Sequence, residues 1–412
     1  MVKSFFSALF ILYVSVLFAQ NTKNDSAHPL KPIGCDCKKA VKITVGWNSK
    51  YGPTMDTKGF GDIEEIPVKD KHSKYYFEAE HNSAWYLLKM NADGELVFDI
   101  VPVDPKNDYD FLLFKYRDSG FCRNFLERKL IPVRSNISRV SDEDSGKTGL
   151  SIKAKVEYET RGKGFSYSKS IHVKKDEQYM LVLDNVNDSG RGHTILFHIL
   201  KEFNISGKTL DDDSMPIAAD VTITAKNGTV LAKTESDKTT GEYNLTVPLQ
   251  MVTQYNLICN TQNSFFDINP FFTGLKQKDT IRYKPVILPK LIAGKKYKLK
   301  NILFEPGLAV PLEESYVTMG VLYTILTNHK NMTIIIEGHV NSPGDSTSNV
   351  AWNLSVERAK TVYNYLISKG INRERLKTMG FGGRHPIYFN PKDWNEEEQN
   401  RRVEIRIISL GE

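Results

Sequence analysis

The sequence predicts a multidomain chain in which two all-β sandwiches are followed by an α/β domain. The 412 residues exceed what a single hydrophobic core serves, so about three domains are expected. Between residues 59 and 273, short aromatic and β-branched runs alternate with turn residues, a pattern typical of sandwiches. After residue 295, strand-like and helix-like segments alternate instead, which requires crossover connections and therefore an α/β arrangement.

The first residues have the pattern of an export signal. Residues 1–19 contain Lys3, an apolar run over 5–18 and a small residue at Ala19. The run is too short to span a bilayer comfortably, so it predicts a signal peptide that is cleaved after Ala19. No cysteine stands at the cut, and no later stretch is apolar enough for a membrane helix. We therefore expect an exported mature chain with neither a lipid anchor nor a transmembrane segment.

The composition limits the classes of partner. Charged residues make up 25% of the chain and hydrophobic residues 40%, which excludes a mainly disordered protein. The net charge of +6 is mild and fits contact with an anionic polymer. No dense basic stretch is interleaved with aromatic residues, so nucleic acid is not an expected partner.

The first β region is predicted to be a jelly-roll-like sandwich over residues 59–202. It is preceded, over residues 20–58, by a linker and one strand near Val41–Val45. Runs rich in aromatic and β-branched residues indicate further strands. These are residues 75–79, 84–89, 95–101, 111–116, 151–158, 166–173, 178–183 and 193–199.

Four cysteines occur: Cys35, Cys37, Cys122 and Cys259. An exported chain can form disulfides. Pairing of Cys122 with Cys35 or Cys37 would tie the N-terminal segment to the first sandwich. The Cys-Asp-Cys spacing has no histidine partners at the distances typical of zinc sites, so a structural role is expected.

Acidic residues in the same region raise the question of a metal. Asp104, Asp108, Asp110 and Asp184 are hard oxygen ligands of the kind that calcium prefers. Aspartates in such positions more often form turns. We therefore expect no cofactor, with calcium at Asp104, Asp108 and Asp110 as the alternative.

A second alternative is a hydrolase acting on cell wall or glycans from the first sandwich. It would use His81, Ser83 and Asp110. A G-x-S-x-G elbow on a strand-to-helix turn, the usual setting of a nucleophilic serine in α/β hydrolases, does not accompany them. The sequence therefore favours a noncatalytic protein.

The second β region covers residues 203–273. Apolar and polar residues alternate around Val221–Ala225 and Tyr243–Val247, which predicts half-buried strands. The T-G-E-Y turn before the second run resembles the carboxypeptidase regulatory-like or Cna-B-like fold, a transthyretin-like sandwich. That resemblance implies a spacer module without chemistry of its own. Residues 274–294, with Pro285 and Pro289, are predicted to link it to the last domain.

The last domain, residues 295–412, is predicted to alternate strands and helices. The expected strands are residues 297–304, 333–337, 375–380 and 402–408, and the expected helices are 312–328, one opened at Ser355, and a short one near 395. Val403, Ile405 and Ile407 alternate with charged residues, as in an edge strand with one wet face.

One arginine in this domain suggests a binding site. Val362, Tyr363, Leu366 and Ile367 form the apolar stripe of a helix whose predicted N-cap is Ser355. At roughly 100° per residue, the arginine in the first turn, at position 358, flanks that stripe. Facing the polar end of the preceding strand, its guanidinium would suit a carboxylate, which it can bind through two parallel hydrogen bonds.

Five motifs then occur in order: G-H-x-[DN], L-S-x-x-R-A, G-[IV]-x-x-x-R-[LI], G-x-G-x-x-x-P and N-R-R-V-E. Together they resemble the OmpA-like peptidoglycan-binding domain. The resemblance implies that Arg358 binds a carboxylate of diaminopimelate in the stem peptide. Asn341 stands where an aspartate more commonly binds the ammonium. The resemblance also places Val340, Asn353, Leu354 and Arg401 around the ligand.

The same resemblance implies the setting of the protein. It predicts a noncatalytic adaptor in the periplasm of a Gram-negative bacterium, associated with peptidoglycan and the outer membrane. The C-terminal domain would bind peptidoglycan, while the two β modules would face an outer-membrane or surface protein.

Overall fold

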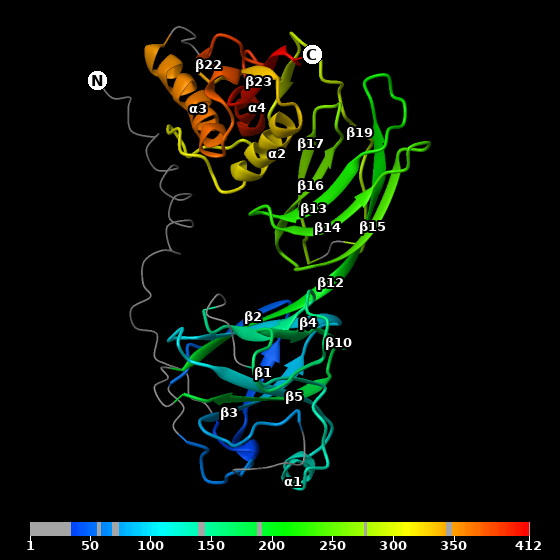
Figure 1. Ribbon diagram of the computed structural model, residues 1–412, viewed down its shortest axis with the longest axis vertical. Helices are drawn as coiled ribbons and strands as arrows, with labels where there is room; N and C mark the ends of the chain where they lie inside the picture. Colours follow the sequence, from blue (N-terminus) through cyan, green and yellow to red (C-terminus); the bar gives the residue numbers. More distant parts are fainter. Residues whose placement is uncertain are drawn as a thin grey trace, which may run out of the picture. The chain divides into compact units, whose positions relative to one another are not determined.

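The computed structural model describes residues 34–55, 59–67, 74–138, 145–187, 192–275, 278–342 and 348–411 (Figure 1). The predicted signal peptide lies outside these residues, as does the first part of the predicted linker. The chain divides into two compact units, Met1–Ile199 and Leu200–Glu412. Among the described residues, none of the helices combines the length and the apolar character needed to cross a lipid bilayer.

The first unit consists of two β-sheets. One has the strand order β1 (Val41–Val45), β3 (Ser83–Met90), β11 (Gln178–Asn185), β5 (Tyr109–Tyr116), β6 (Arg134–Asn136) and β8 (Tyr158–Glu159). The other has the order β12 (His193–Leu210), β4 (Gly94–Pro102), β7 (Thr148–Ser151) and β9 (Tyr167–Lys169). In addition, β2 (Asn48–Tyr51) pairs with β12, and β10 (Ile171–Val173) pairs with β4.

The main core of this unit lies between the two sheets. Tyr86 of β3 and Phe98 of β4 are among its fully buried side chains. The opposite face of the first sheet is also covered, because Trp85 packs in a second cluster with Phe125 of α1 (Phe121–Leu126). Strands buried on both faces lose the alternation of polar and apolar residues, as β11 shows over nearly its whole length.

Two of the predicted strands of this unit are wrong, and a third, 166–173, is divided at Ser170 into β9 and β10. Residues 75–79 form turns, and Tyr76 and Phe77 pack into the second core cluster instead. The predicted strand 151–158 is interrupted, since β7 ends at Ser151 and β8 begins at Tyr158. A short apolar run does not reveal whether its backbone pairs with a neighbouring strand or only buries its side chains.

The predicted cysteine link is confirmed. A disulfide joins Cys37, in the short 3₁₀-helix η2 (Cys37–Lys39), to Cys122 in α1. The N-terminal segment is thereby fixed to the layer that covers the first sheet. Cys35 is half-buried and Cys259 is buried, and both are free thiols.

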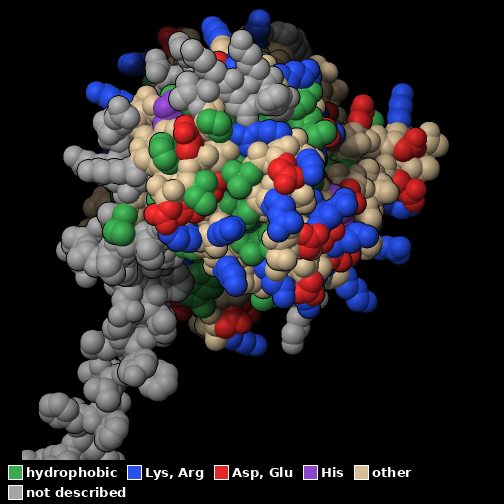
Figure 2. Space-filling model, turned by 90° about the horizontal axis from the view of Figure 1, so that it is seen from below, with side chains coloured by type: hydrophobic (Ala, Val, Ile, Leu, Met, Phe, Trp, Pro, Cys, Tyr) green, Lys and Arg blue, Asp and Glu red, His purple; other side chains and the backbone are tan. Residues whose placement is uncertain are grey.

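The surface of the first unit is mixed in character. Figure 2 views the end of this unit at which α1 lies in Figure 1, and basic, acidic and apolar side chains are interspersed on that face.

The second unit begins with a β-sandwich. Its four-stranded sheet has the order β14 (Val230–Glu235), β13 (Asp220–Ala225), β16 (Gln254–Asn260) and β17 (Asp267–Phe272). The C-terminal part of β12 pairs with β15 (Glu242–Leu249), β18 (Thr280–Arg282) and β19 (Val286–Ile287). The predicted alternation of Tyr243, Leu245 and Val247 is confirmed, because all three side chains are buried.

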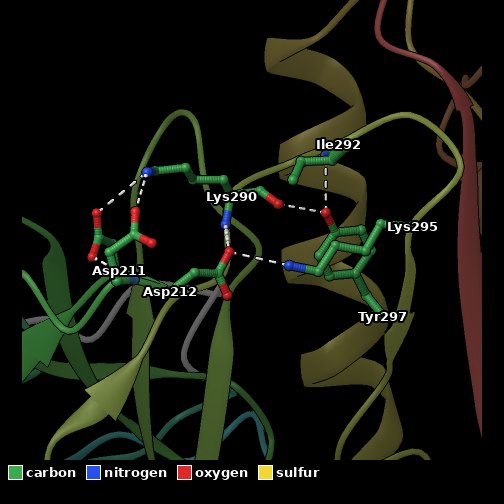
Figure 3. Close-up of polar contacts among 7 residues, drawn as sticks. Asp211, Asp212, Lys290, Ile292, Lys295 and Tyr297 are labelled. Carbon is green, nitrogen blue, oxygen red and sulfur yellow. Dashed lines mark hydrogen bonds and ion pairs between the residues drawn. The ribbon is translucent and has the colours of Figure 1, made fainter.

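Part of the predicted linker 274–294 is strand. β18 and β19 run parallel to β12 and pair with it. The edge of β12 offers unpaired backbone groups there, and the extended chain satisfies them. The remaining linker is held by an acidic turn, in which Asp212 Oδ2 accepts hydrogen bonds from Lys290 N at 3.0 Å and Lys295 Nζ at 3.1 Å (Figure 3).

The last domain has a four-stranded sheet with the order β20 (Lys296–Lys298), β23 (Val403–Ser409), β21 (Thr333–Gly338) and β22 (Leu376–Gly380). The helices are α2 (Ser315–Asn328), α3 (Asn349–Ser368) and the short α4 (Trp394–Asn400). The first two contribute to a shared core with the sheet. The prediction of an edge strand at 402–408 is wrong, since β23 lies between β20 and β21. Its charged residues are ion-paired instead, as in the bond from Arg406 Nε to Glu337 Oε1 at 2.8 Å.

The second helix of the domain begins earlier than predicted. Its N-cap is Ser348, whose side chain accepts a hydrogen bond from Ala351 N, whereas the predicted cap, Ser355, is buried inside the helix. The apolar stripe does not reveal the first turns, because Val350 and Trp352 on them are exposed. Arg358 therefore lies in the third turn, not the first.

Candidate functional site

Two glycines allow α3 to lie directly against the ends of two adjacent strands. A Cβ on Gly338, at the end of β21, would stand 2.0 Å from Ser355 O. A Cβ on Gly380, at the end of β22, would stand 2.4 Å from Val356 Cγ2. Both strands run parallel, so the segments that follow them meet at one edge of the sheet beside the helix. The predicted site residues Val340 and Asn341 lie in the first of these segments.

Ser355 joins the helix to the second of these segments. Its hydroxyl donates to Trp352 O at 2.7 Å and accepts from Gly382 N at 2.9 Å. Val340 N in turn donates to Gly382 O at 3.0 Å. The side chain of Val340 is buried, so this residue holds the two segments together through its backbone and does not face a ligand with its side chain.

Arg358 is buried, with 5% of its surface exposed. Its Nε donates to Leu308 O at 3.1 Å, and its guanidinium lies 4.9 Å from the centre of the Phe304 ring. Among the described residues, no carboxylate pairs with it, and its two terminal nitrogens have no hydrogen-bond partner. Burial, and to a lesser extent the charge of Arg401, lowers the pKa of Arg358 to about 10, so it stays charged at neutral pH.

An uncompensated charge of this kind costs free energy of folding. The backbone carbonyl and the aromatic ring fix one edge and one face of the guanidinium. Its two terminal nitrogens remain as donors of the kind that a carboxylate accepts.

Asn341 is held by a residue that the sequence analysis did not single out. Asn400 Nδ2, at the end of α4, donates to Asn341 Oδ1 at 2.9 Å. Asn400 is 1% exposed, and its Oδ1 accepts from the backbone nitrogens of Ile387 and Tyr388 at 2.7 and 2.9 Å. The carbonyl oxygen of Asn341 retains one lone pair for a cationic ligand group. Asn400 thus positions Asn341 and orders the loop before α4 at the same time.

The other predicted site residues differ in their surroundings. Arg401 is half-exposed, donates to Glu397 Oε2 at 3.1 Å and lies 5.7 Å from the centre of the Trp394 ring. It is also close enough to Arg358 to lower the pKa of that residue. Asn353 is exposed and Leu354 partly exposed, one turn before Arg358 on α3. No side-chain hydrogen bond joins either of them to the other candidates within the described ranges.

A buried ionic network lies next to this edge. Within the described part of the chain, the one group of three metal-type ligand residues is Glu337, His339 and Glu404, whose ligand atoms lie within 4.8 Å of one another. Both carboxylates are already compensated by cations. The partners are Lys296 and Arg406 for Glu337, and Arg402 for Glu404.

The pKa shifts of Glu404 and His339 agree with this pairing of charges. Contact with His339 and with Arg402 lowers the pKa of Glu404 to about 2, while burial lowers the pKa of His339. The imidazole also stacks on Phe381 with ring centres 5.1 Å apart. These features describe a structural ionic network around His339.

Of the contacts of the predicted hydrolase residues, one supports catalysis and another argues against it. His81 Nδ1 lies 2.7 Å from Asp184 Oδ2, an acid–base pair of the type used in catalysis. The hydroxyl of Ser83, however, donates to Cys35 O at 3.0 Å. Asp184 Oδ1 also accepts from the backbone nitrogens of His81 and Asn82 at 2.8 and 2.9 Å, as a loop-forming aspartate does. The hydroxyl of Ser83 is therefore engaged with the backbone rather than with the histidine.

The aspartates considered for calcium serve other contacts. Asp104 Oδ1 accepts from Lys106 N at 3.0 Å, which is the turn-forming role. Burial, followed by the charges of Asp108 and Asp184, raises the pKa of Asp110 well above its ordinary value. In the described ranges, Asp104, Asp108 and Asp110 do not form a group of ligand atoms as close as the one around His339.

The comparison with known proteins concerns the last domain. Residues 303–401 match the OmpA family. These residues form an OmpA-family domain. A peptidoglycan-associated lipoprotein of Mesorhizobium japonicum is 36% identical over 111 residues, which cover 27% of this chain and 64% of the relative. Outer membrane protein A of Escherichia fergusonii is 30% identical over 142 residues, covering 31% of this chain and 58% of the relative.

Among solved structures, the peptidoglycan-associated lipoprotein of Burkholderia pseudomallei is similar, with 20% identity, 26% of this chain and 87% of that chain covered, and a TM-score of 0.24. This chain spans less than two thirds of the length of the curated relatives named above.

Within the OmpA-family domain, sequence reasoning singled out Arg358 in the helix and Asn341, three residues after the strand that ends at Gly338. It missed Leu308, whose carbonyl orients Arg358, because the contact joins residues 50 positions apart. It also missed the role of Asn400, although this residue opens the N-R-R-V-E motif. That motif was the available signal, and only the fold shows that its first residue reaches Asn341.

Proposed function

We propose that the OmpA-family domain binds peptidoglycan through the diaminopimelate residue of the stem peptide, without cleaving it. The observation that carries this proposal is Arg358, a buried guanidinium with no carboxylate partner among the described residues. A cation held in this way favours an anionic ligand, because the ligand would supply the missing countercharge.

The roles of the other residues follow from their contacts. Arg358 takes a carboxylate through its outer edge, while Leu308 O and the Phe304 ring fix its orientation. Asn341 accepts a hydrogen bond from the ligand ammonium with its remaining lone pair. An amide supplies no full negative charge, so this contact is weaker than that of an aspartate. Arg401 adds positive charge at the rim of the same site.

The wider role is that of a noncatalytic adaptor in the periplasm of a Gram-negative bacterium, with the two β regions facing an outer-membrane or surface protein. Names of the similar proteins support this setting, since they include a peptidoglycan-associated lipoprotein and an outer membrane protein. The contacts of Ser83 and Asp184 with the backbone, described above, favour the noncatalytic reading of the first unit.

Sedimentation of the full chain with purified sacculi tests the central proposal. The wild-type chain is expected to sediment with the polymer, and Arg358→Met to remain largely in the supernatant. Lys360→Met is a matched control, because it removes the same charge from an exposed position on the same helix. Equal retention of wild type and Arg358→Met would overturn the assignment of the site.

A further inference from the structure

A cavity of about 340 Å³ lies between the second β-sandwich and the OmpA-family domain. Gln254 and Pro270, from β16 and β17, form one wall. The other walls come from the β20 segment and the end of α4. Their lining residues are Lys298, Leu299, Lys300, Asn301, Ile302, Leu303, Glu314, Glu398, Gln399, Arg401 and Arg402. The cavity is thus built from two domains of one compact unit.

Several contacts hold the two walls together. The Asp212 contacts of Figure 3 fix the segment that connects the domains. Phe265 of the sandwich stacks on Tyr297 of β20 with ring centres 4.6 Å apart. Lys300 Nζ lies 2.5 Å from Asp267 Oδ1, at the start of β17. The walls of the cavity are therefore held together by direct contacts between the two domains.

The lining is basic, with four cationic side chains against two carboxylates. Three of the cations have acidic partners: Lys300 pairs with Asp267, Arg401 with Glu397 and Arg402 with Glu404. The ammonium of Lys298, an exposed side chain of β20, has no ion pair or side-chain hydrogen bond among the described residues. Burial, followed by the charge of Arg402, lowers the pKa of Lys298, while the carboxylates of Glu404 and Glu398 act in the opposite direction.

Two residues that line the cavity lie near the site of Arg358. Arg401 lines it and is also the charge that lowers the pKa of Arg358. Leu303 lines it as well. The ring of the next residue, Phe304, makes the cation–π contact with the Arg358 guanidinium. A ligand bound at Arg358 can therefore extend toward Lys298.

We propose that this cavity is a second anion subsite, in which Lys298 binds a further carboxylate of the stem peptide held by Arg358. The inference rests on the proposed function and extends it. Stem peptides carry several carboxylates, so a second cation near the first increases affinity for the peptide over its isolated amino acid. Lys298, Gln254 and Pro270 lie outside the residues that match the OmpA family, so the subsite belongs to this combination of domains.

Titration of the full chain followed by NMR tests the subsite with two ligands: a diaminopimelate-containing tetrapeptide released from sacculi, and free diaminopimelate. Lys298→Gln is expected to weaken binding of the tetrapeptide about fivefold, the upper range for a partly exposed ion pair, and to leave binding of free diaminopimelate unchanged. Gln254→Glu, which places a carboxylate on the sandwich wall, is expected to weaken tetrapeptide binding in the same selective way. Lys360→Gln serves as the charge-matched control and should change neither affinity.

The outcomes separate the two proposals. If Arg358→Met weakens both ligands and Lys298→Gln weakens neither, the subsite is wrong and the main site stands. An equal loss for both ligands in Lys298→Gln also overturns the subsite, because it would reflect only the overall charge. If Arg358→Met changes neither affinity, both proposals fail. Thermal melting of each variant confirms that it is folded.

Discussion

Replacement of Arg358 by methionine should separate binding from stability. Methionine keeps an unbranched side chain of similar length in the same buried space and removes the charge. For a residue whose task is to hold the fold together, such a change lowers the free energy of unfolding. For a residue kept for a ligand, it lowers affinity and leaves the fold largely as it was.

The structure gives the magnitudes. Lowering the pKa of Arg358 from its ordinary value of 12.5 to about 10 means that the folded protein disfavours the charged form by about 3 kcal/mol. Methionine removes that cost. It also removes the hydrogen bond to Leu308 O, worth about 1.5 to 3 kcal/mol for a charged donor. The two effects largely cancel, so the free energy of unfolding should change by no more than about 1.5 kcal/mol.

Binding should respond differently. The two hydrogen bonds from the guanidinium to a ligand carboxylate are lost without compensation, which corresponds to about 1.5 to 3 kcal/mol, or about a 10- to 150-fold weaker affinity. Urea denaturation measures the first quantity, and calorimetric titration with the diaminopimelate tetrapeptide measures the second. A loss of more than about 3 kcal/mol of stability with unchanged affinity would refute the reasoning. Arg358 would then be a structural residue.

Three further predictions concern other parts of the chain. Asn341→Asp should bind the unmodified tetrapeptide more tightly, above all at low salt, because it adds a countercharge for the ammonium; weaker binding in a titration would show that the amide serves another contact. Loss of the disulfide in Cys37→Ser with Cys122→Ser should lower the free energy of unfolding by about 3 to 5 kcal/mol, since the bond closes a loop with a sequence separation of 85. Urea denaturation checks this, and a loss no larger than that of Cys35→Ser would contradict it. Burial lowers the pKa of His193 to about 3, so between about pH 6.5 and 3 the unfolded chain binds a proton that the folded chain excludes. Stability should therefore fall by about 2 kcal/mol between pH 6.5 and 5, and an equally steep pH dependence in His193→Gln would refute this.

The sequence predicted those elements whose side chains follow a single period. The alternation in β15 and the unbroken run in β21 identified both strands within a residue or two. The same reasoning was wrong for residues 75–79, whose aromatic side chains pack in the second core cluster of the first unit without forming a strand. It also misplaced β23, because alternation shows that one face is polar but not whether that face is wet or ion-paired.

In the candidate site, too, residues with a local signal could be predicted, and roles that depend on distant contacts could not. Arg358 and Asn341 could be singled out from motif spacing, because the helix that carries the first and the strand that precedes the second are local structures. Asn400 and Leu308 could not be assigned their roles, since each acts on a residue more than 45 positions away. The start of α3 was missed for a related reason: its first turns are exposed, so no apolar period marks them.

The sequence by itself determined that the chain ends in an OmpA-family α/β domain with an arginine beside a strand end, because periodicity and motif order are properties of neighbouring residues. Only the tertiary structure decided that this arginine is buried without a carboxylate among the described residues, and that a basic cavity adjoins it. Both are consequences of distant segments packing together: burial removes water from a charge, and the fold determines which groups replace that water.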